Sequence, residues 1–223
     1  MSWEAAYRRF QHAAECGFRV EGPVLRKGYR AKAGSHDDGP AHGPFLGGLG
    51  TGCFSRDLRG RFSRWHMEPG LHVNETIPQA RFLLRWTAAD RGPTDPRAAD
   101  RGARYIGTGA PPTWEGYDPP VDGFPEESRT YAALFPECFE HYDDPDLPVE
   151  VLLHYWSPLV FGDEEAASLP VVYFTVHLRN RLERPIEVAT ALFWPNILGW
   201  RHARVPSVDR ADRSWPGQTH SGN

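Results

Sequence analysis

Apolar and polar residues alternate most clearly in the C-terminal half of the chain, in PVVYFTVHLRN (170–180) and RPIEVATALFW (184–194). A period of two is typical of β-strands that bury one face. Because the connection RLE (181–183) is short, we predict that the two strands form an antiparallel hairpin. The residues expected to share the apolar faces are Val172, Phe174, Val176 and Leu178 in the first strand, and Ile186, Val188, Leu192 and Trp194 in the second.

The same reasoning predicts two more strands, in ARFLLRW (80–86) and VEVLLHYWSP (149–158). Helical spacing is found near the N-terminus, where Trp3, Tyr7, Phe10 and Ala14 predict an amphipathic helix over residues 2–16, with Gly17 as its stop. With almost no helical pattern between the strands, the expected fold class is all-β. We predict an antiparallel β-sandwich with a short N-terminal helix and long Pro/Gly-rich loops.

Two regions interrupt these patterns. Residues 17–44 include AGSHDDGPAHGP and are expected to form a loop. Between Thr87 and Pro125, thirteen of 39 residues are Gly or Pro, which is too many for a helix or a central strand. We therefore expect residues 87–125 to be a surface excursion within one β-sandwich domain that spans residues 1–223.

Composition and charge exclude several classes of protein. A chain of 223 residues can bury a sizeable core, and a hydrophobic fraction of 40% is typical of a folded protein. The formal net charge of −4 argues against a nucleic-acid partner, which would require a basic surface. No segment reaches the ~18 apolar residues of a transmembrane helix, and the N-terminus lacks the apolar core of a signal peptide.

The cysteines give a further indication of the compartment. Cys16, Cys53 and Cys138 are widely spaced, odd in number and form no CxxC motif. Such a set is typical of reduced thiols rather than of a disulfide framework or a zinc site. We therefore predict a cytoplasmic protein without a bound cofactor.

The stretch GGLGTGCFSRDLRGRFSRW (47–65) is rich in glycine but does not match a phosphate-binding loop. Gly48, Gly50 and Gly52 alternate, whereas a dinucleotide loop requires GxGxxG at the start of a helix, and no GK[ST] follows. Alternate glycines in a strand-like run instead permit close backbone approach or positive φ. We predict a hairpin of two short strands whose turn is RDLRG (56–60), in which Gly60 supplies the unusual dihedral angle.

The strand after this turn, RFSRW (61–65), has a simple alternation. It is expected to place Phe62 and Arg64 on one side, and Arg61, Ser63 and Trp65 on the other. Something must pack closely against the glycine backbone, so the segment is a candidate docking edge.

These residues resemble the signature of the N-terminal domain of glycoside hydrolase family 116, the family of bile-acid β-glucosidases and non-lysosomal glucosylceramidases. Leu46 to Gly52 are similar to its LGGIGxG motif. Arg59, Gly60 and Phe62 are similar to RGxF, and Arg64 and Trp65 begin its RWQ motif, with His66 in place of glutamine. Two later blocks, YAALFPECFEHYDD (131–144) and SLPVVYFTVHLRNRLERPIEVATALFWPN (168–196), resemble the family's YxALYPxAW segment and its SSLP strand with the strand that follows.

The resemblance implies an N-terminal β-sandwich that precedes a larger (α/α)6 barrel. In this family the barrel holds a Glu nucleophile and an Asp acid/base, and it hydrolyses β-glucosides with retention, which requires two carboxyl groups about 5–5.5 Å apart. A chain of 223 residues stops before such a barrel. We therefore expect a non-catalytic domain, incomplete at its C-terminal end, whose partner is the barrel in cis or in trans and which meets the substrate through that barrel.

A catalytic or metal site within the chain itself is the less favoured interpretation. Adjacent carboxylates in loop-like contexts are usually solvated, and nothing separates their pKa values. Two histidine-containing groups lack recognised ligand spacing. The carboxylate doublets are Asp37/Asp38, Glu126/Glu127, Asp143/Asp144 and Glu164/Glu165, and the histidine-containing groups are His36, Asp37, Asp38 and His42, and His66 with His72.

The eight tryptophans leave a second function open, that of a stand-alone carbohydrate-binding module. Trp86, Trp156 and Trp194 lie in strand patterns and are expected in the core, whereas Trp65, Trp114, Trp200 and Trp215 are expected to be more exposed. We predict that Trp65 contacts another domain, because aromatic residues often anchor interfaces. The full set of predicted interface residues is Gly47, Gly48, Gly50, Gly52, Arg59, Gly60, Arg64 and Trp65.

Overall fold

The helices and strands of the protein confirm the predicted class. The computed structural model describes residues 1–22, 43–68, 71–73, 76–77, 80–88, 101–109 and 121–194. The elements in chain order are α1 (Trp3–Cys16), β1 (Phe18–Glu21), β2 (Phe45–Gly48), β3 (Gly52–Arg56), β4 (Phe62–Glu68), β5 (Leu71–Val73), β6 (Arg81–Ala88), β7 (Arg101–Thr108), β8 (Gly123–Phe124), η2 (Glu126–Ser128), β9 (Arg129–Leu134), β10 (Glu137–Tyr142), β11 (Val149–Trp156), α2 (Glu164–Ser168), β12 (Tyr173–Asn180) and β13 (Ile186–Phe193).

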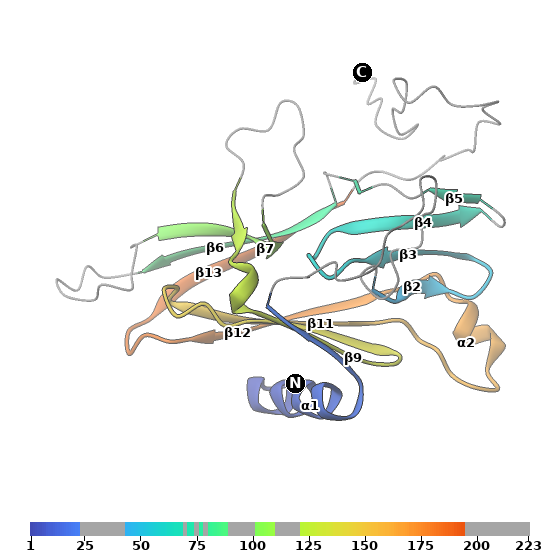
Figure 1. Ribbon diagram of the computed structural model, residues 1–223, viewed down its shortest axis with the longest axis horizontal. Coiled ribbons are helices and arrows are strands. Elements are labelled where there is room, and N and C mark those ends of the chain that lie inside the picture. The colour runs from blue at the N-terminus through green and yellow to red at the C-terminus, as the bar shows by residue number, and fades with distance from the viewer. Residues whose placement is uncertain are drawn as a thin grey trace, which may run out of the picture.

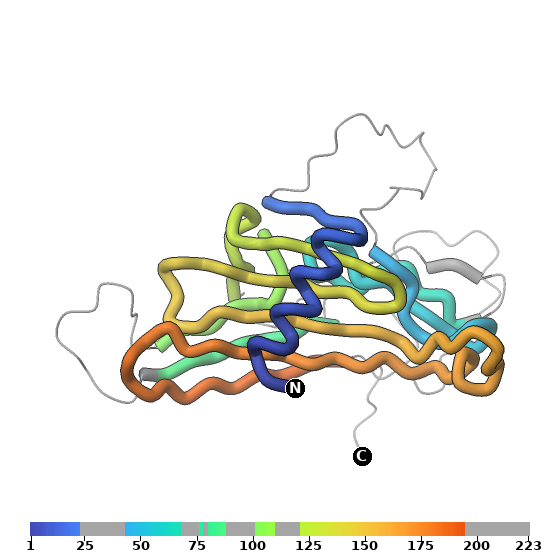
Figure 2. The backbone as a smooth tube through the Cα atoms, turned by 90° about the horizontal axis from the view of Figure 1, so that it is seen from below, coloured from blue at the N-terminus to red at the C-terminus, as the bar shows by residue number. Residues whose placement is uncertain are grey.

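These strands form a sandwich of three sheets (Figure 1). A five-stranded sheet with the order β1-β9-β10-β11-β12 lies against two four-stranded sheets with the orders β13-β6-β7-β8 and β2-β3-β4-β5. Neighbouring strands are antiparallel, apart from the parallel pair β7 and β8. Helix α1 crosses the outer face of the five-stranded sheet (Figure 2).

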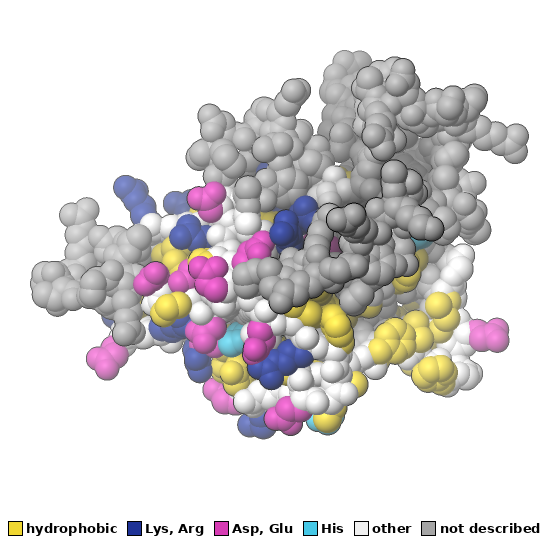
Figure 3. Space-filling model, in the orientation of Figure 1, with side chains coloured by type: hydrophobic (Ala, Val, Ile, Leu, Met, Phe, Trp, Pro, Cys, Tyr) yellow, Lys and Arg dark blue, Asp and Glu magenta, His cyan; other side chains and the backbone are white. Residues whose placement is uncertain are grey.

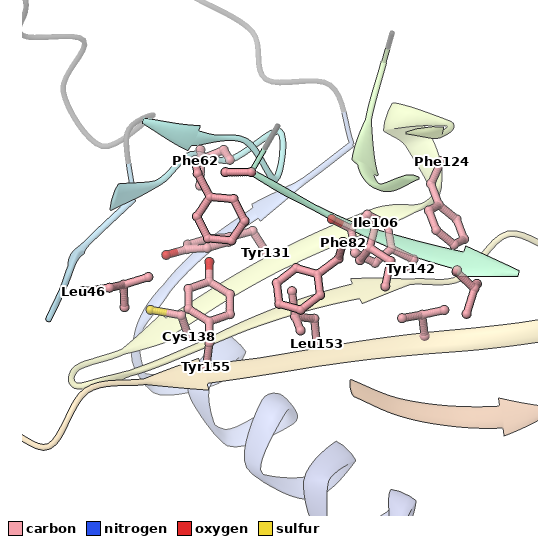
Figure 4. Packing of buried hydrophobic residues seen from close by; sticks show 14 of the residues in the cluster. Leu46, Phe62, Phe82, Ile106, Phe124, Tyr131, Cys138, Tyr142, Leu153 and Tyr155 are labelled. Atoms are coloured by element: carbon pink, nitrogen blue, oxygen red, sulfur yellow. The ribbon is translucent and has the colours of Figure 1, made fainter. Parts of the chain in front are cut away.

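The main core lies between the sheets, where aromatic and aliphatic side chains from all three interleave (Figure 4). Strand β11 is buried on both faces, which explains its nearly continuous apolar sequence. Its residues Val151 and Leu153 join the main core, whereas Leu152 packs beneath α1.

The N-terminal helix forms as predicted. The Ser2 hydroxyl accepts a hydrogen bond from the Ala5 amide at 3.3 Å and caps the first turn. Ala6, Phe10 and Ala13 of α1 pack against Ala132, Phe139 and Leu152 of the sheet.

The predicted hairpin between residues 170–180 and 184–194 is wrong. Strand β12 pairs with β11, and β13 pairs with β6 in the opposite sheet. The Asn180 side chain fastens the connection: its Oδ1 accepts from the Leu182 amide at 2.9 Å, and its Nδ2 donates to the Arg184 carbonyl at 2.7 Å. A short connection can equally join two strands of one sheet or cross between packed sheets, so length alone did not distinguish them.

The loop predictions were also partly wrong. Residues 18–21 form β1 at the edge of the five-stranded sheet. Within the predicted excursion 87–125, β7 is a central strand with buried Tyr105 and Ile106. Its glycines are packing positions: a Cβ on Gly102 would lie 2.2 Å from the indole Cζ2 of Trp86, and one on Gly107 would lie 2.3 Å from the Tyr105 ring.

A β-bulge changes the expected alternation in β4. The register shifts between Cys53 and Ser55 of β3, and Arg64 adopts a φ of 51°. The extra residue turns the strand, so that Phe62 and Trp65 both enter the main core instead of lying on opposite sides.

Candidate interdomain surface

The alternating glycines form a β-hairpin and not an anion-binding cup. Strands β2 and β3 are antiparallel, and their paired residues run from Phe45 with Ser55 to Gly48 with Gly52. The element that follows the glycine loop is therefore a strand, β3, rather than a helix. Gly50 in the connecting loop has a φ of 74°, and Gly47 and Gly52 also have positive φ, which glycine adopts at little cost. The predicted hairpin with its turn at RDLRG is confirmed by the pairing of β3 with β4, whereas the glycines, expected in one strand-like run, form a second turn between β2 and β3.

Close packing explains why glycine occupies several positions of this hairpin. The Gly47 amide donates to the Ser157 hydroxyl at 2.8 Å, and the Leu49 amide donates to the Ala167 carbonyl at 2.9 Å. A Cβ on Gly48 would lie 2.2 Å from the carbonyl oxygen of Ser168. The hairpin is therefore held against the end of β11 and against α2, and the amides of Gly47 and Leu49 have protein partners.

An apolar groove opens beside the hairpin, between it and the ends of β12 and β13. Its volume is about 520 Å³, within the range of ligand and docking pockets. The described residues that line it include no charged side chain, and they are Leu46, Gly47, Thr51, Gly52, Cys53, Phe54, Met67, Pro170, Val172, Phe174, Leu192 and Trp194.

Large apolar side chains remain exposed in and around this groove. Leu49 is 62% exposed, Leu192 is 45% exposed and Trp194 is 37% exposed. Figure 3 shows apolar side chains gathered at this end of the molecule, over β2 and α2. Exposed apolar side chains gathered on one face are typical of a protein contact.

Trp65 lies beneath this groove and is not exposed. Its side chain has no solvent-accessible surface, and its ring lies 5.3 Å from the Phe54 ring and 5.5 Å from the Trp194 ring. The predicted exposure of Trp65 is therefore wrong, because the bulge at Arg64 turns the indole into the core. Of the three tryptophans expected in the core, Trp86 is buried as predicted and Trp156 is half-buried, whereas the prediction is wrong for Trp194, which is 37% exposed at the end of β13. Trp114, Trp200 and Trp215 lie outside the described residues.

The other half of the glycine-rich stretch has a structural role that sequence reasoning missed. Arg56 is fully buried, and its guanidinium forms a bidentate pair with Glu140 on β10, at 2.7 Å for Nε–Oε1 and 2.9 Å for Nη2–Oε2. The same group donates to the carbonyls of Gly60 and Ile106, and Tyr105 also donates to Gly60. We call Arg56, Glu140 and these contacts the arginine anchor.

The arginine anchor explains the turn at RDLRG. Gly60 has a φ of 79°, as predicted, and a Cβ there would lie 2.7 Å from Gly107. Arg59 forms an ion pair with Glu126 at 3.3 Å, and Glu126 lies far along the chain from the glycine hairpin. The predicted interface residues therefore do not form one surface: Gly47 and Gly52 line the groove, Gly60 belongs to the arginine anchor, and Arg59 pairs with Glu126.

Burial and the Glu140 charge shift the pKa values of the groups around the arginine anchor. Desolvation by itself would lower the pKa of Arg56, but the neighbouring Glu140 carboxylate more than compensates and holds it well above its ordinary value. Burial, followed by the Glu140 charge, raises the pKa values of Tyr142 and Tyr155 far above the usual range. Both tyrosines donate hydrogen bonds to Glu140, and Arg56 and the two tyrosines keep one charge state at neutral pH.

The candidate carboxylates that the structure describes are not arranged as a catalytic or metal site. Glu126 lies in η2, Asp143 pairs with Arg181, and Glu164 and Glu165 form the first turn of α2. Across the part of the chain that the structure describes, no three His, Cys, Asp or Glu side chains come together as metal ligands. Asp37, Asp38, His36 and His42 lie outside that part, as does the side chain of His72.

The fold and the groove define the class of the protein: an all-β sandwich with an open apolar groove. A sequence model of one family, described as beta-glucosidase 2, glycosyl-hydrolase family 116 N-term, matches residues 43–223. The chain therefore belongs to the family of N-terminal domains of glycoside hydrolase family 116. None of the described helices is both long and apolar enough to cross a bilayer.

Proposed function

We propose that the chain is a non-catalytic β-sandwich domain that supports an (α/α)6 glycosidase barrel, and that the apolar groove meets this barrel. The observation that supports the proposal best is the groove itself, which has no carboxylate among its described lining residues and has exposed apolar side chains at its rim. Retaining hydrolysis of a β-glucoside needs two carboxyl groups on either side of the scissile bond. The groove can supply contact area but not this chemistry.

The buried carboxylates support the same proposal, because each has a structural partner. Glu140 is bound in the arginine anchor, and Glu150 accepts from His141 at 2.6 Å. Asp57 accepts from the Arg59 and Arg61 amides, both at 2.9 Å, and Asp144 accepts from the Asp146 amide at 3.0 Å. A catalytic acid must be free to exchange its proton with substrate, and these groups are occupied.

The three cysteines carry no disulfide, which favours a cytoplasmic location.

The interface is tested with a charge placed in the groove. We expect Leu192→Glu to weaken association with the barrel at least about tenfold, because a buried unpaired charge costs several kcal/mol. Leu192 is 45% exposed, so the variant should fold normally. Thr175→Glu, on the outer face of β12, is the matched control. Equal affinity of the two variants and the wild type, measured by titration calorimetry with the separately expressed barrel, would contradict the proposed interface.

Activity is tested with 4-nitrophenyl β-D-glucoside. The purified chain should show no hydrolysis, and activity that depends on the barrel nucleophile should appear when the barrel is present. The coding DNA after the Asn223 codon shows whether that barrel is supplied in cis. Hydrolysis by the chain alone would overturn the non-catalytic role.

A carbohydrate-binding module is the second candidate, favoured by Trp194, which lines the groove and is 37% exposed. Sugar rings stack on accessible aromatic faces, so binding of a glucoside should quench Trp194 fluorescence. The test compares the wild type with Trp194→Leu: quenching that is lost in the variant supports sugar binding, and an unchanged spectrum of the wild type supports the interdomain role.

A further inference from the structure

Helix α1 covers three buried histidines on neighbouring strands of the five-stranded sheet. His141 on β10 is 6% exposed, His154 on β11 is 3% exposed and His177 on β12 is 7% exposed. The helix precedes the region matched by the family, which begins at residue 43. The face of the sheet that the helix crosses therefore carries three titratable side chains.

Two of these imidazoles have one ring nitrogen that is buried without a hydrogen-bond partner among the described residues. The Nε2 atoms of His154 and His177 are both buried and unpaired. The His154 ring stacks on the Phe139 ring at 4.5 Å, and its nearest carboxylate oxygen, Oε1 of Glu137, is 3.7 Å away. That distance exceeds a hydrogen bond, and Arg9 of α1 already pairs with the same carboxylate. A neutral imidazole fits this apolar site, whereas a cation would lack compensation.

The charges that face these histidines from the helix are positive. Burial, followed by Arg9 and His177, lowers the pKa of His154 to about 4. Burial, followed by the amino group of Met1, lowers the pKa of His177. Each added proton would therefore meet a positive charge on α1 as well as a desolvation cost.

The nearby negative charge on β11 is committed to other groups. Glu150 accepts from His141 and also pairs with Arg179 and Arg181. Burial by itself would raise the pKa of Glu150, but the hydrogen bond from His141 and the charges of Arg179 and Arg181 hold it below its usual value. The Glu150 carboxylate is thus committed to His141, Arg179 and Arg181, and it is not a partner of His154 or His177.

We propose that α1 is an acid-released clasp, which undocks from the five-stranded sheet when His154 and His177 take up protons. The released helix stays tethered, because β1 pairs with β9 from Phe18 with Ala133 to Glu21 with Thr130. Gly17 is the junction: a Cβ there would lie 2.1 Å from the Ala133 carbonyl oxygen. Release exposes the apolar patch of Ala132, Phe139 and Leu152.

The direction of the pH dependence follows from the lowered pKa values. Above the ordinary imidazole value of about 6.5, both histidines are neutral in either state, and docking is at full strength. As the pH falls from about 6.5 toward 4, the undocked state binds more protons and is favoured. From the value for His154 alone, the opening constant should rise roughly thirtyfold between pH 7.5 and pH 5, and His177 adds to this increase.

Hydrogen exchange of the complete chain tests the clasp. Peptides covering residues 3–16 are compared between pH 7.5 and pH 5 after correction for intrinsic exchange rates, with peptides from β11 as the internal reference. We expect protection of α1 to fall about thirtyfold or more while β11 stays protected. Equal protection of α1 at both pH values would overturn the proposal.

Histidine variants separate protonation from a general loss of stability. His154→Phe with His177→Leu keeps apolar volume under the helix and should remove the acid response. Each single variant should reduce the number of protons coupled to opening from two toward one, which decides the matter if the double variant does not fold. His12→Gln is the matched control, because His12 is exposed on the same helix; its response should equal that of the wild type. A wild-type response in both single variants would refute the clasp.

Discussion

Replacing Arg56 with methionine should destabilise the domain by about 3–5 kcal/mol, because it leaves the Glu140 carboxylate buried without its cation. Both side chains are completely buried, and the guanidinium also binds the Gly60 and Ile106 carbonyls. The variant therefore breaks the link between the RDLRG turn, β7 and β10 in one step.

Urea unfolding followed by circular dichroism measures this effect as a shift in the midpoint at constant slope. Arg19→Met is the matched control, since it removes an exposed pair in which Arg19 and Glu21 are 48% and 59% exposed. Exposed pairs contribute about 0–1 kcal/mol, so the control should unfold close to the wild type. A loss below 1 kcal/mol for Arg56→Met would show that the arginine anchor does not stabilise the fold.

The second large effect is expected for Trp65→Ala, with a loss of about 3–5 kcal/mol from the free energy of unfolding. The indole is fully buried against Phe54 and lies below the partly exposed Trp194, so truncation creates a cavity under the groove. The loss should appear in the isolated chain, without any partner domain.

This prediction distinguishes a core residue from an interface residue. Thermal or urea unfolding of the isolated chain is compared with that of Phe161→Ala, whose side chain is 92% exposed and should change stability by less than about 0.5 kcal/mol. If Trp65→Ala unfolded like the wild type but bound the barrel more weakly, Trp65 would be an interface residue after all.

The surface that supports the proposed function could be predicted only in part. The alternate glycines indicated close backbone packing, and Gly47 and Gly52 do line the groove. The remaining lining comes from distant segments, such as Val172 on one side and Leu192 on the other. No local pattern brings those residues together, because their approach depends on β12 and β13 entering different sheets.

The arginine anchor was missed for a similar reason. Arg56 and Glu140 are 84 positions apart, and each looks like an ordinary polar residue in its own strand. One signal was available in the sequence: Glu140 lies between the apolar residues Cys138 and Tyr142 on the same core-facing row of β10. A charged residue on such a row requires a buried counterion.

Local chemistry was sufficient for the class of fold, for α1 with its Ser2 cap, for most strands and for the Gly60 turn, because periodicity and dihedral preference act between near neighbours. The pairing of β12 with β11 and of β13 with β6, the turning of Trp65 into the core and the apolar groove depended on how the sheets pack. These features rest on contacts between residues far apart in the chain, and their energies exist only once the sandwich has formed.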